Sequence, residues 1–196
     1  MRIIGITGPT GAGKTTALNA LRDLGAEVID ADALYHKLLE EDEGLKKALR
    51  AAFGEQIADK MGRIDRKALA AAVYPDRLEE LNALTHPAIL SAIGKQVELA
   101  RKAGKPAVAI DAIALIESGL GEKCDEVVAV LAPLEVRVRR IMVRDGVDEG
   151  YARRRAMAQK DDGFFRAHAG YVLENRADDT PEGFRERAAE LFRRLL

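Results

Sequence analysis

Residues 8–15 read GPTGAGKT, a complete match to the pattern G-x-x-x-x-G-K-[ST]. Residues 2–7, just before it, are rich in isoleucine and predict a short buried strand. After it, apolar residues recur at helical spacing from Ala17 to Leu24, and Gly25 is a helix stop. Strand, glycine-rich loop and helix N-terminus together direct backbone N–H groups at an anion. The stretch therefore predicts a parallel α/β fold that binds a nucleoside triphosphate.

Two side chains of this loop carry specific roles in the pattern. Lys14 reaches the β- and γ-phosphates, and the Thr15 hydroxyl is a ligand for Mg²⁺. We expect the other loop positions to line the phosphates as well; these are Gly8, Gly11, Ala12, Gly13 and Thr16.

The composition is that of a soluble globular protein with much helix, and the length predicts one domain. In 196 residues, 31 Lys and Arg balance 32 Asp and Glu, so no net field favours nucleic acid or a membrane. Cys124 is the only cysteine, which excludes an intrachain disulfide and favours a reducing compartment. We expect no signal peptide, because residues 1–24 form the phosphate-binding unit, and no apolar run is long enough for a bilayer. These observations predict a cytoplasmic protein.

Strands and helices alternate along most of the chain. Further strands are predicted at 26–30, 106–111, 126–131 and 171–174, and further helices at 133–144, 148–160 and 181–195. The pattern predicts a five-stranded parallel sheet with helices on both faces, within one domain spanning 1–196. Its nucleotide-binding core is expected at 1–32 and 103–196, with a small lid at about 139–160.

Residues 33–102 form an unusually long helical insert between two strands. Breaks are predicted near Gly44, at 54–65, at Pro75 and at Pro87. The insert is a candidate to close over a second substrate. It contains His86, which has no second His or Cys at metal-ligand spacing and which, by itself, is more often structural than catalytic.

Carboxylates follow two predicted strands, where ligands of such sheets gather. In the run Asp30-Ala31-Asp32, both carboxylates face one side if the chain stays extended, and they diverge if a helix begins after Asp30. One of them is a helix cap or a general base for an acceptor hydroxyl. Asp111 is either a residue near Mg²⁺ or a cap, and Glu117 lies on the same rim.

Arginines crowd residues 137–155. Arg140 and Arg144 are four residues apart and share a helix face, which makes them candidates to clamp the phosphoryl group during transfer. For Arg137, Arg139 and Arg153 we expect a solvated basic surface instead.

A regulatory GTPase and a small-molecule kinase compete as interpretations. A GTPase needs D-x-x-G after the third strand, where residues 111–114 read DAIA. Residues 175–178, NRAD, only superficially match the guanine-reading N-K-x-D. A kinase needs a donor loop, an acceptor base, an arginine lid and a closing insert, and all four have candidates. The kinase class is favoured, with a nucleoside or nucleoside monophosphate acceptor as one alternative.

The chain resembles the dephospho-coenzyme A kinases nearly from end to end. The resemblance rests on the loop with Thr16, VIDAD at 28–32, Phe53-Gly54, IDR at 64–66, Leu69, Leu81-Asn82, HPAI at 86–89, ESG at 117–119, Arg140, RDG at 144–146, Arg155 with Gln159, and YVLEN at 171–175. Members resemble nucleoside monophosphate kinases in fold and transfer the ATP γ-phosphoryl group to the ribose 3′-hydroxyl of dephospho-coenzyme A.

The resemblance implies ATP as co-substrate, Mg²⁺ as cofactor and a monomer or small homo-oligomer. It makes Asp32 the base, supported by Asp30, and places His86 and Glu117 at the acceptor. Arg140 and Arg144 become lid residues, and Asn175 a neighbour of the adenine pocket.

The chain departs from the family pattern at three places. Pro9-Thr10 replaces an early third glycine of the loop. IALIE at 113–117 replaces P-L-L-F-E, which alters one wall of the acceptor pocket. NRA at 175–177 replaces N-x-G beside the adenine.

Overall fold

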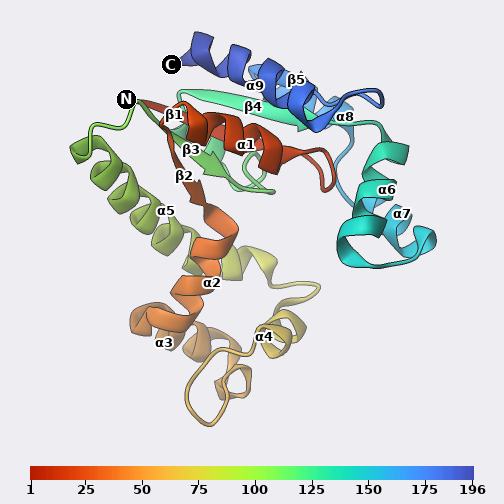
Figure 1. Ribbon diagram of the computed structural model, residues 1–196. Coiled ribbons are helices and arrows are strands. Elements are labelled where there is room, and N and C mark those ends of the chain that lie inside the picture. Colours follow the sequence, from red (N-terminus) through yellow and green to blue (C-terminus); the bar gives the residue numbers. More distant parts are fainter. The chain divides into compact units, whose positions relative to one another are not determined.

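The computed structural model describes all residues, 1–196, and divides into two compact units (Figure 1). The first combines Met1–Ile29 with Leu99–Leu196, and the second is Asp30–Glu98. The first unit holds the sheet and the glycine-rich loop, and the second holds most of the helical insert.

The sheet has five strands in the order β2-β3-β1-β4-β5. Their bounds are β1 (Arg2–Thr7), β2 (Glu27–Asp30), β3 (Ala107–Asp111), β4 (Glu126–Leu131) and β5 (Tyr171–Glu174). β1 pairs in parallel with β3 and with β4, so that Ile6 lies opposite Asp111 on one side and Val128 on the other. β4 in turn pairs in parallel with β5. The predicted five-stranded parallel sheet is confirmed, and the loop follows its central strand.

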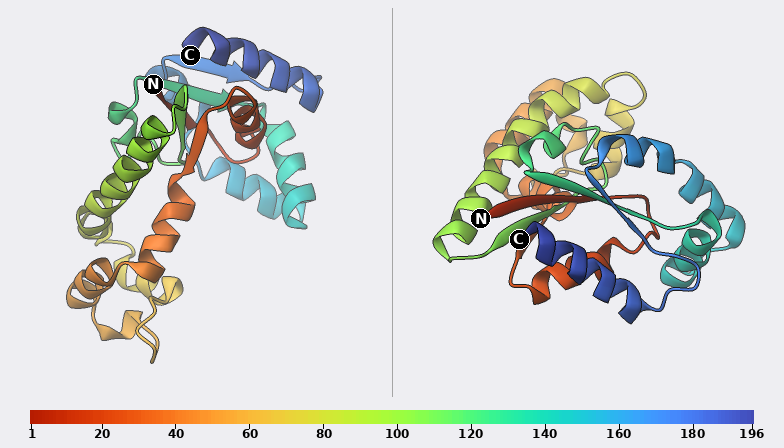
Figure 2. Two further views of the ribbon diagram at one scale, coloured as in Figure 1. Left: turned by 60° about the vertical axis from the view of Figure 1, so that its left-hand side comes forward. Right: turned by 90° about the horizontal axis from the view of Figure 1, so that it is seen from above.

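Helices cover both faces of the sheet, and successive residues of β4 show it. Val128 and Val130 belong to the core cluster that includes Phe184 of α9 (Pro181–Leu195) and Leu21 of α1 (Lys14–Asp23). The alternate β4 residues Ala129 and Leu131 pack instead with Phe165 of α8 (Asp162–His168). The right-hand view of Figure 2 shows α1 and α9 on one side of the strands and α8 on the other. A strand buried on both faces needs this continuous apolar sequence.

Between β4 and α8 lies a pair of helices, α6 (Leu134–Asp145) and α7 (Glu149–Met157). They pack on each other through Val138, Ile141, Ala152 and Ala156. The sequence predicted one helix at 148–160, but α7 ends at Met157 and the separate helix α8 was missed. The side chain of Asp161 caps α8, because its Oδ1 accepts a hydrogen bond from the Phe164 amide at 2.8 Å.

The second unit has its own hydrophobic core. Its helices are α2 (Ala31–Glu41), α3 (Glu43–Phe53), α4 (Arg66–Val73) and the part of α5 (Leu78–Lys102) that ends at Glu98. A 3₁₀ turn, Glu55–Ile57, follows α3, and a second one, Leu120–Lys123, precedes β4 in the first unit. The buried residues of the second unit's core include Leu39, Leu49, Phe53, Ile57 and Leu69.

The break predicted near Gly44 is present, and the one predicted near Pro87 is absent. Gly44 lies inside α3, and the break falls at Asp42, whose side chain accepts a hydrogen bond from the Leu45 amide at 2.9 Å. Pro87 does not break α5. A proline there removes a backbone hydrogen bond, but Leu84 and Ala88 on either side of it pack onto the core of the second unit. Burial of the flanking residues holds the helix together across the proline.

Because each unit has its own core, we expect a substitution in one core to destabilise only the unit that contains it. Leu49 in α3 and Phe192 in α9 are both fully buried, one in each unit. Leu49→Ala removes about 2–5 kcal/mol of packing, and we expect faster amide hydrogen exchange within 30–98 while 1–29 and 99–196 keep their protection. Phe192→Ala is the matched control and reverses the pattern. Equal acceleration everywhere in both variants would show that the two cores unfold as one.

Candidate functional site

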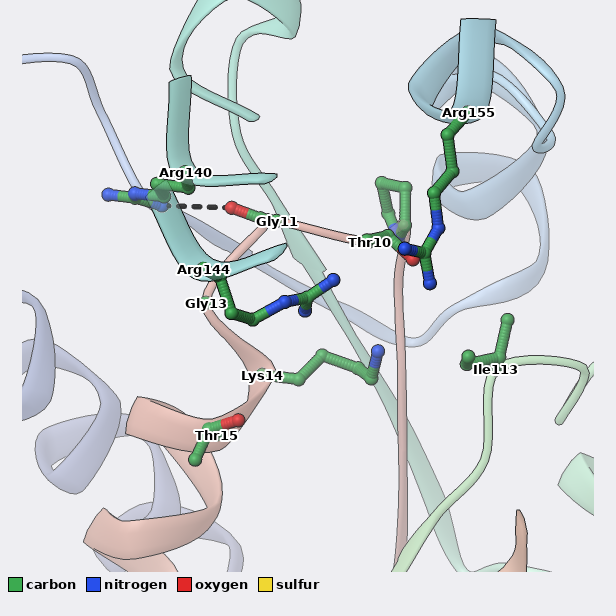
Figure 3. Close-up of a pocket in the computed structure, with 10 residues that line it drawn as sticks. Thr10, Gly11, Gly13, Lys14, Thr15, Ile113, Arg140, Arg144 and Arg155 are labelled. Atoms are coloured by element: carbon green, nitrogen blue, oxygen red, sulfur yellow. Dashed lines mark hydrogen bonds between the residues drawn. The ribbon is translucent and has the colours of Figure 1, made fainter. Parts of the chain in front are cut away.

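A cavity of about 330 Å³ opens over the glycine-rich loop (Figure 3). Its lining consists of loop residues between Pro9 and Thr15, Ile113 after β3, and Arg140, Arg144 and Arg155. In Figure 3 the side chains of Lys14, Arg144 and Arg155 point into the same space. Four of the lining side chains are cationic and none is acidic, so the cavity suits a polyanion.

The backbone of the loop requires glycine at defined positions. Gly8 has a φ of +135°, and a Cβ there would lie 2.1 Å from the Val130 carbonyl oxygen. Gly13 has a φ of +107°, and a Cβ there would lie 2.3 Å from Nδ2 of Asn175. No residue other than glycine has a positive φ anywhere in the chain. Pro9 and Thr10 therefore adopt ordinary conformations, and the loop needs no third glycine there.

Side chains from the C-terminal half of the chain bind the carbonyl groups of the loop. Arg137 Nε donates to the Thr10 oxygen at 3.1 Å, and Arg140 Nη1 donates to the oxygens of Gly11 and Ala12 at 3.2 and 3.3 Å. Asn175 Nδ2 also donates to the Ala12 oxygen, at 2.9 Å. In a trans peptide the C=O and the following N–H point in opposite directions. These contacts thus turn the N–H groups of Gly11 and Gly13 away from the side chains that hold the loop.

The N-terminus of α1 is open to an anion. No side chain caps it, and its first turn contains no acidic residue. Lys14 Nζ donates to the Gly8 oxygen at 3.2 Å, and the Thr15 side chain is exposed and lines the cavity. The helix dipole and the nearby cations favour negative charge at this end.

Arg137 is not part of a solvated surface, as the sequence predicted, but is only 5% exposed. Its Nη2 donates to the Ala156 oxygen at 2.8 Å, so one guanidinium joins the loop to the end of α7. Burial lowers the pKa of Arg137, and also that of Arg140. Arg139 is exposed as expected, and Arg153 pairs at the surface with Glu135 and Glu149.

The loop amide of Thr10 has a partner that the site prediction missed. Gln159 Oε1 accepts a hydrogen bond from the Thr10 amide at 2.7 Å. Arg137 and Gln159 therefore hold both sides of residue Thr10. The only sequence signal for Gln159 was its place four residues after Arg155.

Arg144 and Arg155 meet at one carboxylate. Arg144 donates to both oxygens of Asp145, from Nε at 2.7 Å and from Nη2 at 3.0 Å, and Arg155 Nη1 donates to Oδ2 at 2.7 Å. These hydrogen bonds and charges lower the pKa of Asp145, so it is a carboxylate at neutral pH. Arg155 also lines the cavity, although no site role was predicted for it.

Asn175 is a structural part of the loop's support. It is 4% exposed, and its Oδ1 accepts a hydrogen bond from Arg140 Nη2 at 3.1 Å. Both ends of its amide are therefore engaged, with Arg140 and with Ala12. An asparagine held in this way does not read a guanine base, which removes the main sequence feature shared with GTPases.

The loop after β3 contributes oxygen groups and one apolar side chain. Asp111 is the last residue of β3, and the buried Thr7 hydroxyl donates to the Ile113 oxygen at 3.2 Å. Glu117, further along, is exposed and outside the cavity lining. The structure contains no cluster of three or more His, Cys, Asp or Glu side chains arranged for a metal ion.

The remaining candidates belong to the second unit. Asp30 is the cap of α2, because its Oδ1 accepts a hydrogen bond from the Ala33 amide at 2.8 Å. The helix begins at Ala31, so Asp32 lies in its first turn and the two carboxylates diverge. His86 is half-buried in α5.

No helix of the structure has the length and apolar character to cross a bilayer. Comparison with known proteins agrees with the architecture described above. The family model for dephospho-CoA kinase matches residues 2–180. A dephospho-CoA kinase of Corynebacterium diphtheriae is 39% identical over 89% of this chain and 88% of its own length.

Among solved structures, TT1252 from Thermus thermophilus superposes with a TM-score of 0.82 at 36% identity, covering 100% of this chain and 97% of the other. A dephospho-CoA kinase from Campylobacter jejuni superposes with a TM-score of 0.69 at 26% identity, covering 98% and 96%. The chain belongs to the dephospho-CoA kinase family.

Proposed function

We propose that this protein transfers the γ-phosphoryl group of ATP to the ribose 3′-hydroxyl of dephospho-coenzyme A, the last step of coenzyme A synthesis. The observation that carries the proposal is the cationic cavity over the glycine-rich loop, in a chain of the dephospho-CoA kinase family. We assign the reaction to the cytoplasm, whose reducing environment suits a chain with a single cysteine. Burial raises the pKa of that thiol, Cys124, to about 12, so it takes no part as a nucleophile.

On the donor side, the loop amides and Lys14 hold the β- and γ-phosphates. Phosphoryl transfer depends mainly on positioning and on neutralising charge spread over the transferred group. Arg144 and Arg155 line the cavity and supply that neutralisation, while Arg140 both lines the cavity and fixes the loop. Ala12 and Thr16 complete the loop and its helix, and Asn175, the residue after β5, supports the carbonyl of Ala12.

The donor set also fits Mg²⁺, which prefers hard oxygen ligands. The Thr15 hydroxyl lines the cavity, and we assign Asp111, at the end of β3, to the shell of the ion. When bound with ATP, Mg²⁺ supplies charge neutralisation at the phosphate oxygens.

On the acceptor side, Asp32 is the general base that takes the proton of the attacking hydroxyl. It lies in the first turn of α2, and Asp30 supports it indirectly, because its cap fixes the start of that helix. His86 and Glu117 are assigned to the binding of the acceptor.

Acceptor identity is tested by measuring ADP release with dephospho-coenzyme A, nucleosides, nucleoside monophosphates and small sugars in parallel. We expect turnover with dephospho-coenzyme A and stoichiometric formation of the 3′-phosphorylated product, identified by mass spectrometry. Turnover confined to a nucleoside or a monophosphate would overturn the acceptor assignment and leave the kinase class intact.

Two substitutions separate base chemistry from donor binding. Asp32→Asn keeps the shape of the side chain but cannot take a proton, so we expect kcat to fall about 10²–10⁴-fold with ATP affinity nearly unchanged. Lys14→Ala removes a phosphate contact, and we expect it to weaken ATP binding and transfer together. Calorimetric titration with a non-hydrolysable ATP analogue checks both, and lost analogue affinity in Asp32→Asn would make Asp32 a structural residue.

The support of the loop by Asn175 yields a further prediction. Asn175→Ala removes its hydrogen bonds to Ala12 and Arg140, worth about 1–1.5 kcal/mol in all, so we expect the Kd for the ATP analogue to rise about tenfold. The KM for the acceptor should stay unchanged. Asn19→Ala, on the exposed face of α1, is the matched control and should leave both constants as they are. Equal effects of the two substitutions would contradict the assigned support.

A further inference from the structure

Asp145 occupies a special place among the charges of the first unit. It is the last residue of α6, directly before Gly146, and it is the carboxylate shared by two arginines of the cavity lining. Its side chain is 22% exposed, while those of Arg144 and Arg155 are 55% and 46% exposed. The carboxylate is therefore the most enclosed member of this group of three charges.

The hydrogen bonds leave part of each guanidinium for another acceptor. Asp145 takes the Nε and Nη2 edge of Arg144 and does not use Nη1. It takes only Nη1 of Arg155 and does not use Nη2 or Nε. Each guanidinium has five N–H donors in a fixed plane, so a carboxylate on one edge sets the direction of the others.

Stability is a weak explanation for this arrangement. Exposed ion pairs contribute little to folding, and the α6–α7 pair already has an apolar contact through Ile141 and Ala152. A negative charge beside the cavity also opposes the binding of a polyphosphate. The carboxylate works against ground-state binding, so its benefit must lie in geometry.

We propose that Asp145 is a positioning residue, which holds Arg144 and Arg155 in the orientation that stabilises the charge of the phosphoryl group during transfer. The inference rests on the proposed kinase function of the same cavity. Preorganised donors act most strongly on charge that develops in the transition state, because they need no rearrangement during the reaction. Asp145 thus lowers the affinity for ATP slightly and raises the rate of transfer.

The two effects have opposite signs, which makes the proposal testable. In Asp145→Ala we expect kcat for transfer to dephospho-coenzyme A to fall about 10–100-fold, while the Kd for a non-hydrolysable ATP analogue stays equal or decreases. Asp145→Asn keeps one oxygen acceptor without the charge, and we expect an intermediate kcat. Glu149→Ala is the matched control: it removes a carboxylate that binds Arg153 on the same pair of helices, away from the cavity, and should change neither constant.

A second comparison shows whether Asp145 acts through the arginines. In an Arg144→Ala, Arg155→Ala background, adding Asp145→Ala should lower kcat no further. A further loss there, or an unchanged kcat in Asp145→Ala, overturns the proposal. A parallel loss of ATP affinity in Asp145→Ala and Asp145→Asn also overturns it, because that outcome marks a structural role.

Different measurements test the proposed function and the role of Asp145. Wild-type turnover of dephospho-coenzyme A tests the proposed function. The ratio of variant to wild type tests Asp145, measured on whichever acceptor the wild type uses, or on hydrolysis of ATP where no acceptor is used.

Discussion

The structure of the donor site depends on one set of hydrogen bonds, those from buried side chains to the carbonyl groups of the glycine-rich loop. Arg137, Arg140 and Asn175 supply them, and they come from α6 and from the residue after β5. A loop with glycine at positive φ has many conformations available when it stands alone. Fixing its carbonyls from one side leaves the amides of Gly11 and Gly13 on the other, so the anion site exists before any ligand binds. Preorganisation of this kind lowers the entropic cost of binding.

Helix α6, which holds the loop through Arg137 and Arg140, also carries Arg144 of the cavity lining, and α7 carries Arg155. Arg137 and Arg140 donate hydrogen bonds to backbone oxygens and so hold the loop in place. Arg144 and Arg155 donate theirs to the carboxylate of Asp145. Arg137 and Arg140 are more buried than Arg144 and Arg155. A guanidinium bonded to loop carbonyls would leave polar groups without partners if it moved, while one oriented by Asp145 keeps its remaining N–H groups for a phosphate. The arginine-rich segment, which spans α6 and α7, therefore contains two functions.

Local signals predicted most of the fold but only part of the site. The loop pattern, the apolar strands and the position of α1 follow from residues close in sequence, and the sheet and the donor loop were predicted correctly. The burial of Arg137 has no local signal, because its partner Thr10 lies 127 residues away. Asn175 is separated from Ala12 by 163 residues, and its resemblance to a guanine reader was a coincidence of sequence. The roles of Asp32, His86 and Glu117 stay predictions.

The departures from the family pattern differ in physical weight. Glycine is indispensable at Gly8 and Gly13 because a Cβ there would overlap the β4 backbone or the Asn175 amide. Pro9-Thr10 needs no glycine, and Thr10 is held on both sides by Arg137 and Gln159. Proline has a fixed φ, and both backbone polar groups of Thr10 are hydrogen-bonded to side chains. This pair therefore restricts the loop more than a glycine would. This replacement therefore strengthens the preorganisation on which the donor site depends.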